Sequence, residues 1–284
     1  MTPAAHAAGD AGDAGDAGTP PLVLITGASS GIGQALAAHY AQAGWRLALV
    51  ARRAGVLQDW ASSHGLESAR CRVYAADVAD TRQIVAAGHA CLAAQGLPDV
   101  VIANAGISVG MDSAERADLD VLRDTFATNN LGLAATFQPF LKPMRARRRG
   151  TLVGVASVAA IRGLPGHAAY CASKSAVVAY CESLRGECRP YGVRVVTLLP
   201  GYVATPLTAR NPYSMPFLMA PATFATRAAK AIEVGASYRV IPWQMGIVAW
   251  AMRALPNPLF DRLMVGRARK PRRPADRPRP PPEA

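Results

Sequence analysis

The stretch Leu22-Val-Leu-Ile-Thr-Gly-Ala-Ser-Ser-Gly-Ile-Gly33 decides the fold. Its first five residues are apolar or β-branched without alternation, which is typical of a parallel strand buried on both faces. Glycines follow at positions 27, 31 and 33, and residues 34–43 have a helical pattern. A strand, a glycine-rich turn and a helix form a phosphate cradle, because glycine lets the backbone approach closely and the helix N-terminus offers free N–H groups. The spacing Gly-x-x-x-Gly-x-Gly is not the more familiar Gly-x-Gly-x-x-Gly, so the turn alone does not decide the function.

Strand-like and helical stretches alternate along the rest of the chain. Strands are predicted at 46–50, 70–76, 100–103, 151–157 and 193–199, and helices at 81–94, 117–129, from 131 to the basic run 145–149, and at 168–188. Such alternation indicates right-handed βαβ units. We therefore predict an α/β fold, a Rossmann-type doubly wound parallel sheet in a single domain over residues 21–240.

Ligands of such sheets bind beyond the carboxyl ends of the strands. The residues that follow the predicted strands should therefore gather along one edge, although the sequence spreads them widely: Thr26, Arg52, Asp77, Asn104, Ser157 and Pro200.

Length and composition indicate a globular protein with terminal extensions. The chain has 284 residues, of which 51% are hydrophobic and 18% charged. Residues 1–20 are an Ala/Gly/Asp-rich leader without the apolar core of a signal peptide. The net charge of +12 is unevenly distributed, because seven basic residues fall between Arg267 and Arg279, beside six prolines up to the end of the chain. We predict that both ends are disordered and that the basic tail, residues 266–284, is solubilising. Contact with anionic lipid is the alternative, and no nucleic-acid partner is expected.

The five cysteines exclude some classes of protein. Cys71, Cys91, Cys171, Cys181 and Cys188 are odd in number and none has Cys-x-x-Cys spacing. This pattern indicates a reducing compartment rather than a disulfide scaffold, and it predicts no metal site. With no apolar run long enough to span a bilayer, we predict a cytoplasmic protein, with peripheral contact to the inner face of a membrane as an alternative.

The end of the second strand bears on the cofactor. In dinucleotide folds a carboxylate at this position binds the 2′-hydroxyl of the adenosine ribose, and an Arg accommodates a 2′-phosphate. This chain has Ala51 followed by Arg52 and Arg53. The alternative interpretation is that Arg52 and Arg53 belong to a basic loop of a basic protein and have no role in cofactor binding. Together with the glycine-rich turn, the two Arg favour NADP(H) over NAD(H).

The segment Tyr170-Cys-Ala-Ser-Lys174 offers a proton-transfer pair. On a helix, side chains four residues apart share a face, and a nearby cation favours the phenolate of a Tyr. A Tyr ring covered by the aliphatic stem of a Lys would give the same spacing. The spacing of Tyr170 and Lys174 alone therefore does not indicate a catalytic pair, and the rest of the sequence must support that interpretation.

Over residues 22–205 the chain resembles the short-chain dehydrogenase/reductases, in the compact single-domain branch. The resemblance is carried by the following motifs, in this order: Thr26-Gly-Ala-Ser-Ser-Gly-Ile-Gly33, Asp77-Val78, Asn104-Ala-Gly106, Asn129-Asn-Leu-Gly132, Ser157, Tyr170-x-x-x-Lys174 and Pro200-Gly-Tyr-Val-Ala-Thr205. The family's first Asn of Asn-Asn-Ala-Gly is Ala103 here.

The resemblance implies four catalytic residues. Tyr170 would be the general acid or base at the substrate oxygen, and Ser157 would bind that oxygen. Lys174 would bind the nicotinamide ribose and lower the pKa of Tyr170. Asn129 would hold a water beside Lys174. Asn130 is the alternative to Asn129, and the spacing to Gly132 favours Asn129.

The resemblance also implies a cofactor-binding set along the strand ends. This set is Gly27, Ser29, Ser30, Gly31, Ile32, Gly33, Arg52, Arg53, Asp77, Val78, Asn104, Ala105, Gly106, Tyr170, Lys174, Pro200, Gly201, Val203 and Thr205.

Beyond residue 205 the motifs stop. Residues 206–220, rich in Pro, Met and aromatics, correspond to the family's substrate lid and favour an apolar substrate. The apolar segment 241–265 has three possible roles: packing on the domain or on a second copy, a pocket wall, or an interfacial membrane helix.

We therefore expect an NADP(H)-dependent oxidoreductase that interconverts a carbonyl compound and an alcohol, the substrate being hydrophobic. A non-catalytic NADP-binding sensor or scaffold on the same fold is the alternative. The resemblance also implies a homodimer or homotetramer.

Overall fold

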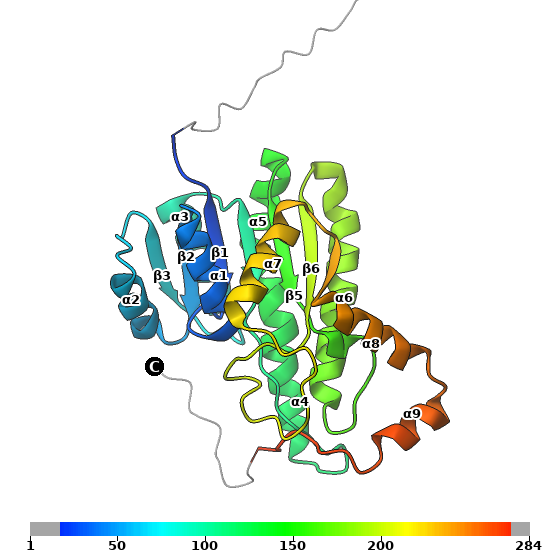
Figure 1. Cartoon of the computed structure of the whole chain (residues 1–284). Helices are drawn as coiled ribbons and strands as arrows, with labels where there is room; N and C mark the ends of the chain where they lie inside the picture. The colour runs from blue at the N-terminus through cyan, green and yellow to red at the C-terminus, as the bar shows by residue number, and fades with distance from the viewer. Residues whose placement is uncertain (1–17, 274–284) are drawn as a thin grey trace, which may run out of the picture.

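A seven-stranded parallel sheet forms the centre of the computed structural model, which describes residues 18–273 (Figure 1). The strand order is β3-β2-β1-β4-β5-β6-β7. The strands are β1 (Leu22–Thr26), β2 (Arg46–Ala51), β3 (Cys71–Ala75), β4 (Val100–Ala103), β5 (Thr151–Val155), β6 (Arg194–Pro200) and β7 (Tyr238–Ile241). The prediction of a single-domain, Rossmann-type α/β fold is confirmed.

Helices cover both faces of this sheet. Within residues 18–273 they are α1 (Gly31–Gln42), α2 (Ala54–Ser63), α3 (Thr81–Gln95), α4 (Asp118–Phe126), α5 (Gly132–Arg147), α6 (Ala168–Cys188), α7 (Pro221–Glu233), α8 (Trp243–Ala254) and α9 (Asn257–Met264). The α1, α2 and α7 helices share one hydrophobic cluster with the sheet, and α3, α5 and α6 share another. These clusters form the two halves of the core.

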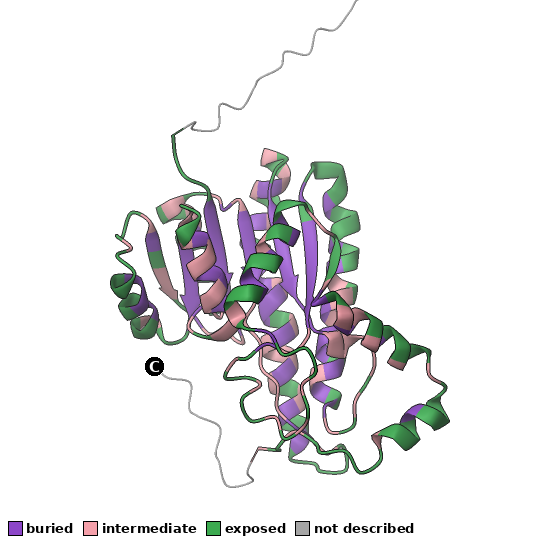
Figure 2. Cartoon of the chain, in the orientation of Figure 1, coloured by how far each residue is buried: buried purple, intermediate pink, exposed green. Residues whose placement is uncertain are grey.

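The inner strands β1, β2, β4, β5 and β6 are mostly apolar without alternation because both of their faces are buried, whereas the edge strands β3 and β7 are partly exposed. In β1, Val23 and Ile25 enter the cluster of α1, α2 and α7, whereas Leu22 and Leu24 enter the cluster on the opposite face. Figure 2 shows the buried strands between helices whose outer surfaces are exposed. Neighbouring side chains of a strand point to opposite faces, so each face receives its own apolar set.

The strand order reverses between β1 and β4. The chain runs from β1 outward to β2 and β3, and returns to the other side of β1 to form β4 to β7. A reversal of this kind opens a crevice at the carboxyl ends of the two neighbouring strands, where open α/β sheets bind their ligands. A cleft of about 1820 Å³ occupies this edge.

The connection between α4 and α5 differs from the prediction. We expected one helix to end at Asn129 and a second to begin at Leu131. Residues 127–131 instead form a π-helical turn that joins α4 to α5 without a break. A single π-helical turn inserts one extra residue per turn and often occurs at functional sites.

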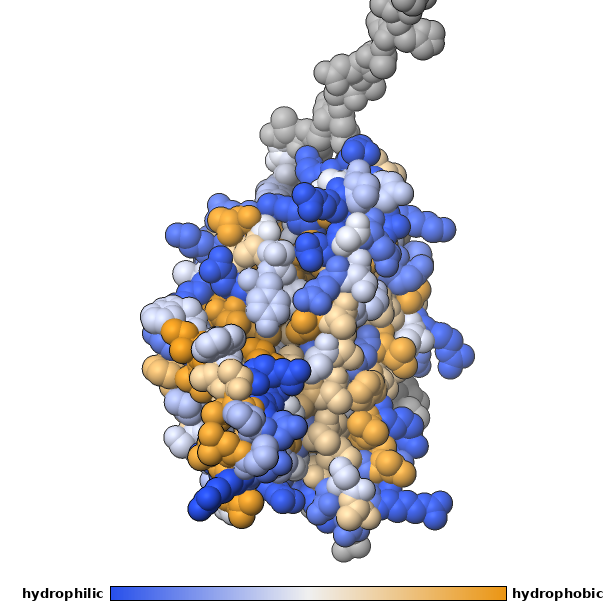
Figure 3. Space-filling view, turned by 90° about the vertical axis from the view of Figure 1, so that its right-hand side faces the viewer, coloured by the Kyte–Doolittle hydropathy of each residue, from blue (hydrophilic) through white to orange (hydrophobic). Residues whose placement is uncertain are grey.

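The predicted apolar segment 241–265 contains α8 and α9, which lie outside the two layers (Figure 1). The Arg162 guanidinium holds them to the domain: it donates to the Leu255 carbonyl at 2.7 Å and lies 3.8 Å over the Phe260 ring. Met245 and Ala249 face inward, whereas Trp243 and Trp250 are exposed. Figure 3 shows hydrophobic and strongly hydrophilic side chains mixed on the side of the molecule that carries these helices.

Residues 266–273 pack on the domain, contrary to the prediction of a disordered tail from residue 266. Arg272 Nε donates to Asp118 Oδ2 at 2.7 Å, and Arg273 donates to Asp124 Oδ2 at 3.1 Å. Local composition predicted disorder, but carboxylates distant in the sequence attract these cations. The rest of the tail and residues 1–17 of the leader lie outside the described residues.

Across residues 18–273, every helix is too short or too polar to cross a membrane. All five cysteines are buried and free.

Candidate active site

The glycine-rich turn after β1 forms one end of the cleft. Gly27 has a positive φ of 66°, and a Cβ on Gly33 would lie 2.2 Å from the Gly27 carbonyl oxygen. Only glycine therefore fits at position 33, where the first helical turn of α1 packs against the glycine-rich turn. Ser30 precedes α1 and, among residues 18–273, makes no side-chain capping hydrogen bond to it. The first N–H groups of the helix consequently remain available for an anion.

Asn104 connects β4 to this turn. Its backbone N–H donates to Thr26 Oγ1 at 3.1 Å, and its Nδ2 donates to the Thr26 carbonyl at 3.0 Å. Asn104 lines the cleft, as the sequence predicted. Its side-chain amide, however, is engaged in holding two strand ends together, so we interpret its role as support of the cradle.

Lys174 and Asn129 lie side by side beneath Gly106. A Cβ on Gly106 would lie 3.2 Å from Asn129 Oδ1 and 3.3 Å from Lys174 Nζ. Lys174 is 4% exposed, and its Nζ donates to the Val155 carbonyl at 2.8 Å. The α6 helix therefore delivers this ammonium to the end of β5, against the segment that follows β4.

Asn129 occupies the π-helical turn and is fully buried. Its Oδ1 accepts from the Ile107 backbone N–H at 2.8 Å, and its Nδ2 donates to Ser173 Oγ at 2.9 Å. Asn130 donates instead to the Ser173 carbonyl. Of the two, Asn129 is therefore the residue whose side-chain oxygen lies near Gly106.

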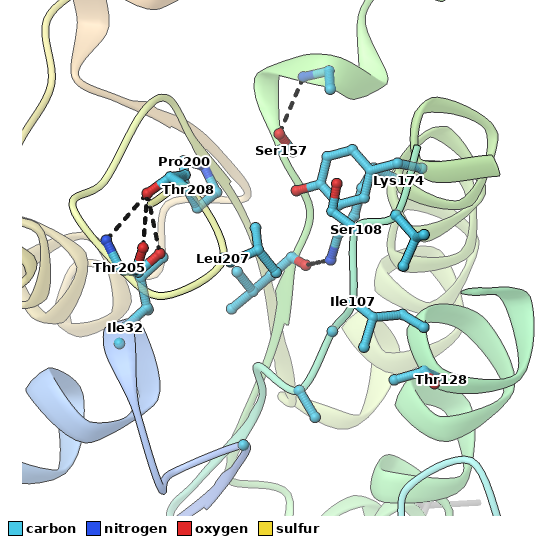
Figure 4. Close-up of a pocket in the computed structure, with 18 of the residues that line it drawn as sticks. Ile32, Ile107, Ser108, Thr128, Ser157, Lys174, Pro200, Thr205, Leu207 and Thr208 are labelled. Atoms are coloured by element: carbon cyan, nitrogen blue, oxygen red, sulfur yellow. Dashed lines mark hydrogen bonds between the residues drawn. The ribbon is translucent and has the colours of Figure 1, made fainter. Parts of the chain in front are cut away.

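Ser157 and Tyr170 line the same cleft as Lys174. The Ser157 hydroxyl accepts from the Ala159 backbone N–H at 3.2 Å, which orients its side chain (Figure 4). Burial raises the pKa of Tyr170, and a hydrogen bond with the Ser157 side chain opposes that rise. Burial lowers the pKa of Lys174 to about 8.

The expected direction of the Tyr170 pKa shift is wrong for the protein without its cofactor. Lys174 was expected to lower this pKa, but its Nζ lies 5.9 Å from the Tyr170 ring centroid and is bonded to the Val155 carbonyl. Burial therefore outweighs the attraction to the cation.

The end of β2 lies at the opposite end of the cleft. Ala51 is buried, and the Arg52 side chain is 67% exposed with Nη1 3.9 Å from Asp77 Oδ2. A long, exposed ion pair of this kind contributes little energy, so Arg52 is free to turn towards another anion. Both Arg52 and Arg53 line the cleft.

The segment after β6 closes the cleft between these two ends. Thr208 Oγ1 accepts from the Thr205 N–H at 3.1 Å, and the Thr205 side chain lies 3.1 Å from the position of a Cβ on Gly31. Figure 4 shows Thr205 and Thr208 on one side of the pocket and Ser108 and Lys174 on the other, with Leu207 between them. All nineteen predicted cofactor residues line this cleft except Gly33, which supports it from behind.

Sequence reasoning missed several residues at the substrate end. His167 Nε2 is 3.1 Å from the Tyr213 hydroxyl, and both residues line the cleft with Met252, Met264 and Lys270. His167 lies only three residues before Tyr170, which is a signal that could have been used. The remaining residues follow the last recognisable motif, so nothing in the sequence marked them.

A dinucleotide fits these residues. The glycine-rich turn and the uncapped α1 suit a diphosphate, and the Lys174 ammonium, which lines the same cleft, suits the hydroxyls of a ribose. Among the described residues no cluster of His, Cys, Asp and Glu could hold a metal ion. The fold and the site together define a nicotinamide-dependent oxidoreductase.

Residues 21–214 match the family described as short chain dehydrogenase, and the chain belongs to that family. An uncharacterized oxidoreductase of Myxococcus xanthus is 40% identical over 238 residues, which cover 84% of this chain and 94% of the relative. The protein is therefore an NAD(P)-dependent short-chain oxidoreductase that acts on CH–OH groups.

Two solved structures share the fold but carry different cofactors. A 3-ketoacyl-(acyl-carrier-protein) reductase from Brucella melitensis, complexed with NADH, is 28% identical with a TM-score of 0.70, covering 78% of this chain and 97% of that chain. An alcohol dehydrogenase from Thermococcus sibiricus, complexed with 5-hydroxy-NADP, is 26% identical with a TM-score of 0.69, covering 78% and 95%. The fold therefore accommodates either dinucleotide.

Proposed function

We propose that the protein is an NADP(H)-dependent oxidoreductase that interconverts a carbonyl compound and an alcohol, with an apolar substrate. The observation that carries this proposal is a single cleft lined by the glycine-rich turn, by Arg52 and by Ser157, Tyr170 and Lys174. Residues from six strand ends thus converge on one site.

Tyr170 and Ser157 act on the substrate oxygen. The nicotinamide, when bound, supplies the hydride for reduction or accepts it for oxidation. In reduction, the Tyr170 hydroxyl donates its proton to the carbonyl oxygen, and in oxidation the phenolate takes a proton from the alcohol. The Ser157 hydroxyl donates a hydrogen bond to the same oxygen, which favours the developing negative charge.

Lys174 and Asn129 support this proton transfer. The Lys174 ammonium, held at the end of β5 by the Val155 carbonyl, binds the hydroxyls of the nicotinamide ribose. Asn129 fixes the Ile107 backbone through two hydrogen bonds, at 2.8 and 3.1 Å. It thereby keeps open the space beside Lys174 in which a water can link the ammonium to solvent.

The preference for NADP(H) rests on the end of β2. Ala51 presents no carboxylate to bind a free 2′-hydroxyl or to repel a 2′-phosphate. Arg52 offers a guanidinium fork that matches phosphate oxygens, and we propose that Arg53 and Ser29, which also line the cleft, assist it.

An apolar substrate suits the other end of the cleft. Met245 and Met252 of α8 line it together with Leu207 of the segment 206–220. Flexible thioether side chains adapt to bulky apolar groups. We propose that residues 206–220 act as the lid over this substrate, and that the inner face of α8 is a pocket wall.

The outer face of α8 is proposed to contact a second copy of the chain. Trp243, Ile247 and Trp250 lie at helical spacing and are exposed. A contiguous exposed apolar face marks an interaction site more often than free surface. The alternative partner for this apolar face and the neighbouring basic residues is a membrane surface.

Initial rates of NADPH oxidation with a panel of aliphatic and aromatic aldehydes and ketones test the proposal. We expect turnover that increases with the apolar bulk of the substrate, and slower rates with NADH at the same concentration. Binding of NADPH without turnover of any carbonyl or alcohol would instead indicate a sensor or scaffold.

A further inference from the structure

Residues 266–273, hereafter the C-terminal strap, cross the substrate end of the cleft. The Gly110 N–H donates to the Pro271 carbonyl at 3.2 Å, beside the ion pairs of Arg272 with Asp118 and Arg273 with Asp124. Asp118 is buried and also accepts from the Asp112 N–H at 2.6 Å. Because one carboxylate is buried and ordered by other contacts, this end of the strap is firmly anchored.

The strap fits the domain closely at one glycine. A Cβ on Gly110 would lie 2.0 Å from the Lys270 carbonyl oxygen. No side chain can be accommodated there unless the strap moves. The absence of a side chain at Gly110, in the segment after β4, therefore lets the strap pack closely at the point where Lys270 enters the cleft.

The Lys270 ammonium bridges the two sides of the cleft. Its Nζ donates to Ser108 Oγ at 3.1 Å and to the Leu207 carbonyl at 3.0 Å. Figure 4 shows Leu207 and Ser108, which belong to the two segments that this ammonium joins. A Lys ammonium has three donors, so these two acceptors leave one N–H for another partner.

No carboxylate in residues 18–273 lies within 4.0 Å of this ammonium. Within the part of the chain that the structure describes, its acceptors are the neutral Ser108 hydroxyl and Leu207 carbonyl, and burial lowers its pKa. A partly buried cation whose partners are neutral lacks a counter-ion, and neutral dipoles replace only part of its hydration. An anion reaching this point would supply the missing charge.

The space around Lys270 also contains apolar and aromatic groups. The charge on Lys270 contributes to lowering the pKa of His167, after burial, so the two side chains face the same region. Tyr213 contacts His167 at 3.1 Å, and Met252 and Met264 line the same cleft. A ligand in this part of the cleft would therefore meet apolar side chains together with the Lys270 ammonium.

We propose that Lys270 is a specificity-determining residue that binds an anionic group, a carboxylate or a phosphate, at the end of an otherwise apolar carbonyl substrate. This inference rests on the proposed function and extends it to the substrate class. A charge-assisted hydrogen bond of Lys270 to this group adds to binding without contacting the reacting carbonyl.

The test compares three ketones with the same alkyl chain, ending in a carboxylate, a phosphate monoester or a methyl ester. We expect the wild type to have a higher kcat/KM for at least one anionic ketone, by roughly ten- to a hundredfold over the methyl ester. Lys270→Met should remove this preference by lowering kcat/KM for the anionic ketone while leaving that for the methyl ester nearly unchanged. The two anionic ketones distinguish carboxylate from phosphate recognition.

Arg269→Gln is the matched control. It removes one positive charge from the same strap, but Arg269 is exposed and does not line the cleft. This variant should keep the wild-type preference. Gly110→Ala, which displaces the strap, should lower kcat/KM for the anionic ketone as Lys270→Met does.

Several outcomes would overturn the inference. One is a wild type that reduces the methyl ester as well as both anionic ketones, in which case the proposed oxidoreductase function stands without this specificity. Another is an equal loss for all three ketones with a raised KM for NADPH in Lys270→Met, which would assign Lys270 to the cofactor diphosphate. Failure of the wild type to reduce any ketone would refute the proposed function as well.

Discussion

Lys174 is a buried cation whose folded-state pKa, about 8, lies below the value of 10.5 for a free Lys. Between these two pH values the unfolded chain binds more protons than the folded one, so the contribution of Lys174 to stability rises with pH. Below pH 8 the full cost of burying the charge is present, and above pH 10.5 it is absent.

We therefore predict that the cofactor-free wild type gains stability relative to Lys174→Met by roughly 3 kcal/mol between pH 8 and 10.5. Other titrating groups cancel in this difference, because both proteins carry them. Urea unfolding of the two proteins across this range measures it. A difference that is flat with pH would show that Lys174 is not a buried ammonium.

Arg52 is predicted to recognise the 2′-phosphate of NADPH. Arg52→Ala should weaken NADPH binding by roughly ten- to a hundredfold, the value of a charge-assisted hydrogen bond, and leave NADH binding nearly unchanged. Ala51→Asp should shift the preference towards NADH, because the new carboxylate repels the phosphate and accepts from the hydroxyl. Dissociation constants for both cofactors at one salt concentration provide the comparison. Equal losses for both would rule out this role.

At the scale of single elements, the close contact of α1 with the glycine-rich turn leads to another prediction. Gly33→Ala places a Cβ 2.2 Å from the Gly27 carbonyl oxygen, so the helix must move away from the cradle. We expect a loss of stability of about 1–3 kcal/mol and weaker binding of NADPH and NADH alike.

Gly186→Ala in α6 is the control for this prediction. A Cβ at position 186 would have open space, and Ala is favoured over Gly inside a helix by up to about 1 kcal/mol. This variant should be as stable as the wild type or more so, with unchanged cofactor binding. Thermal unfolding and fluorescence titration measure both effects, and similar behaviour of the two variants would refute the close-contact argument.

The elements themselves were largely predictable. Each of the strands β1, β4 and β5 is fully buried and largely apolar because the sheet is covered on both faces. The π-helical turn at 127–131 was not predictable, since Ala-Thr-Asn-Asn-Leu has no local feature that distinguishes it from an α-helix. It follows from tertiary contacts, above all those of Asn129 with Ile107 and Ser173.

At the scale of the whole molecule, the sequence predicted the edge of the sheet where the site lies, but not everything that covers it. Ser157, Tyr170 and Lys174 come together because they belong to neighbouring elements of one known topology. Residues 266–273 were predicted to be disordered from their own Arg and Pro content. Their position depends on Asp118 and Asp124, more than 140 residues earlier in the chain.

The exposed face of α8 leads to a prediction about assembly. Trp250 is 71% exposed, and Trp250→Asp should lower the molar mass of the assembled protein in light scattering, because it puts a charge into an apolar contact. Val234→Asp, at an exposed position beyond α7, should leave the mass unchanged. A monomeric wild type that sediments with anionic liposomes at low salt, and is released by high salt, would assign this face to a membrane instead.

The central claim is that this cleft performs proton transfer through Tyr170. Tyr170→Phe keeps the ring in place and removes the hydroxyl. The decisive measurement is kcat for a carbonyl substrate that the wild type reduces, together with the dissociation constant for NADPH, in the wild type and in this variant. We predict a fall in kcat of at least ~10²-fold with nearly unchanged NADPH binding. A variant that retains near-normal kcat would contradict the account.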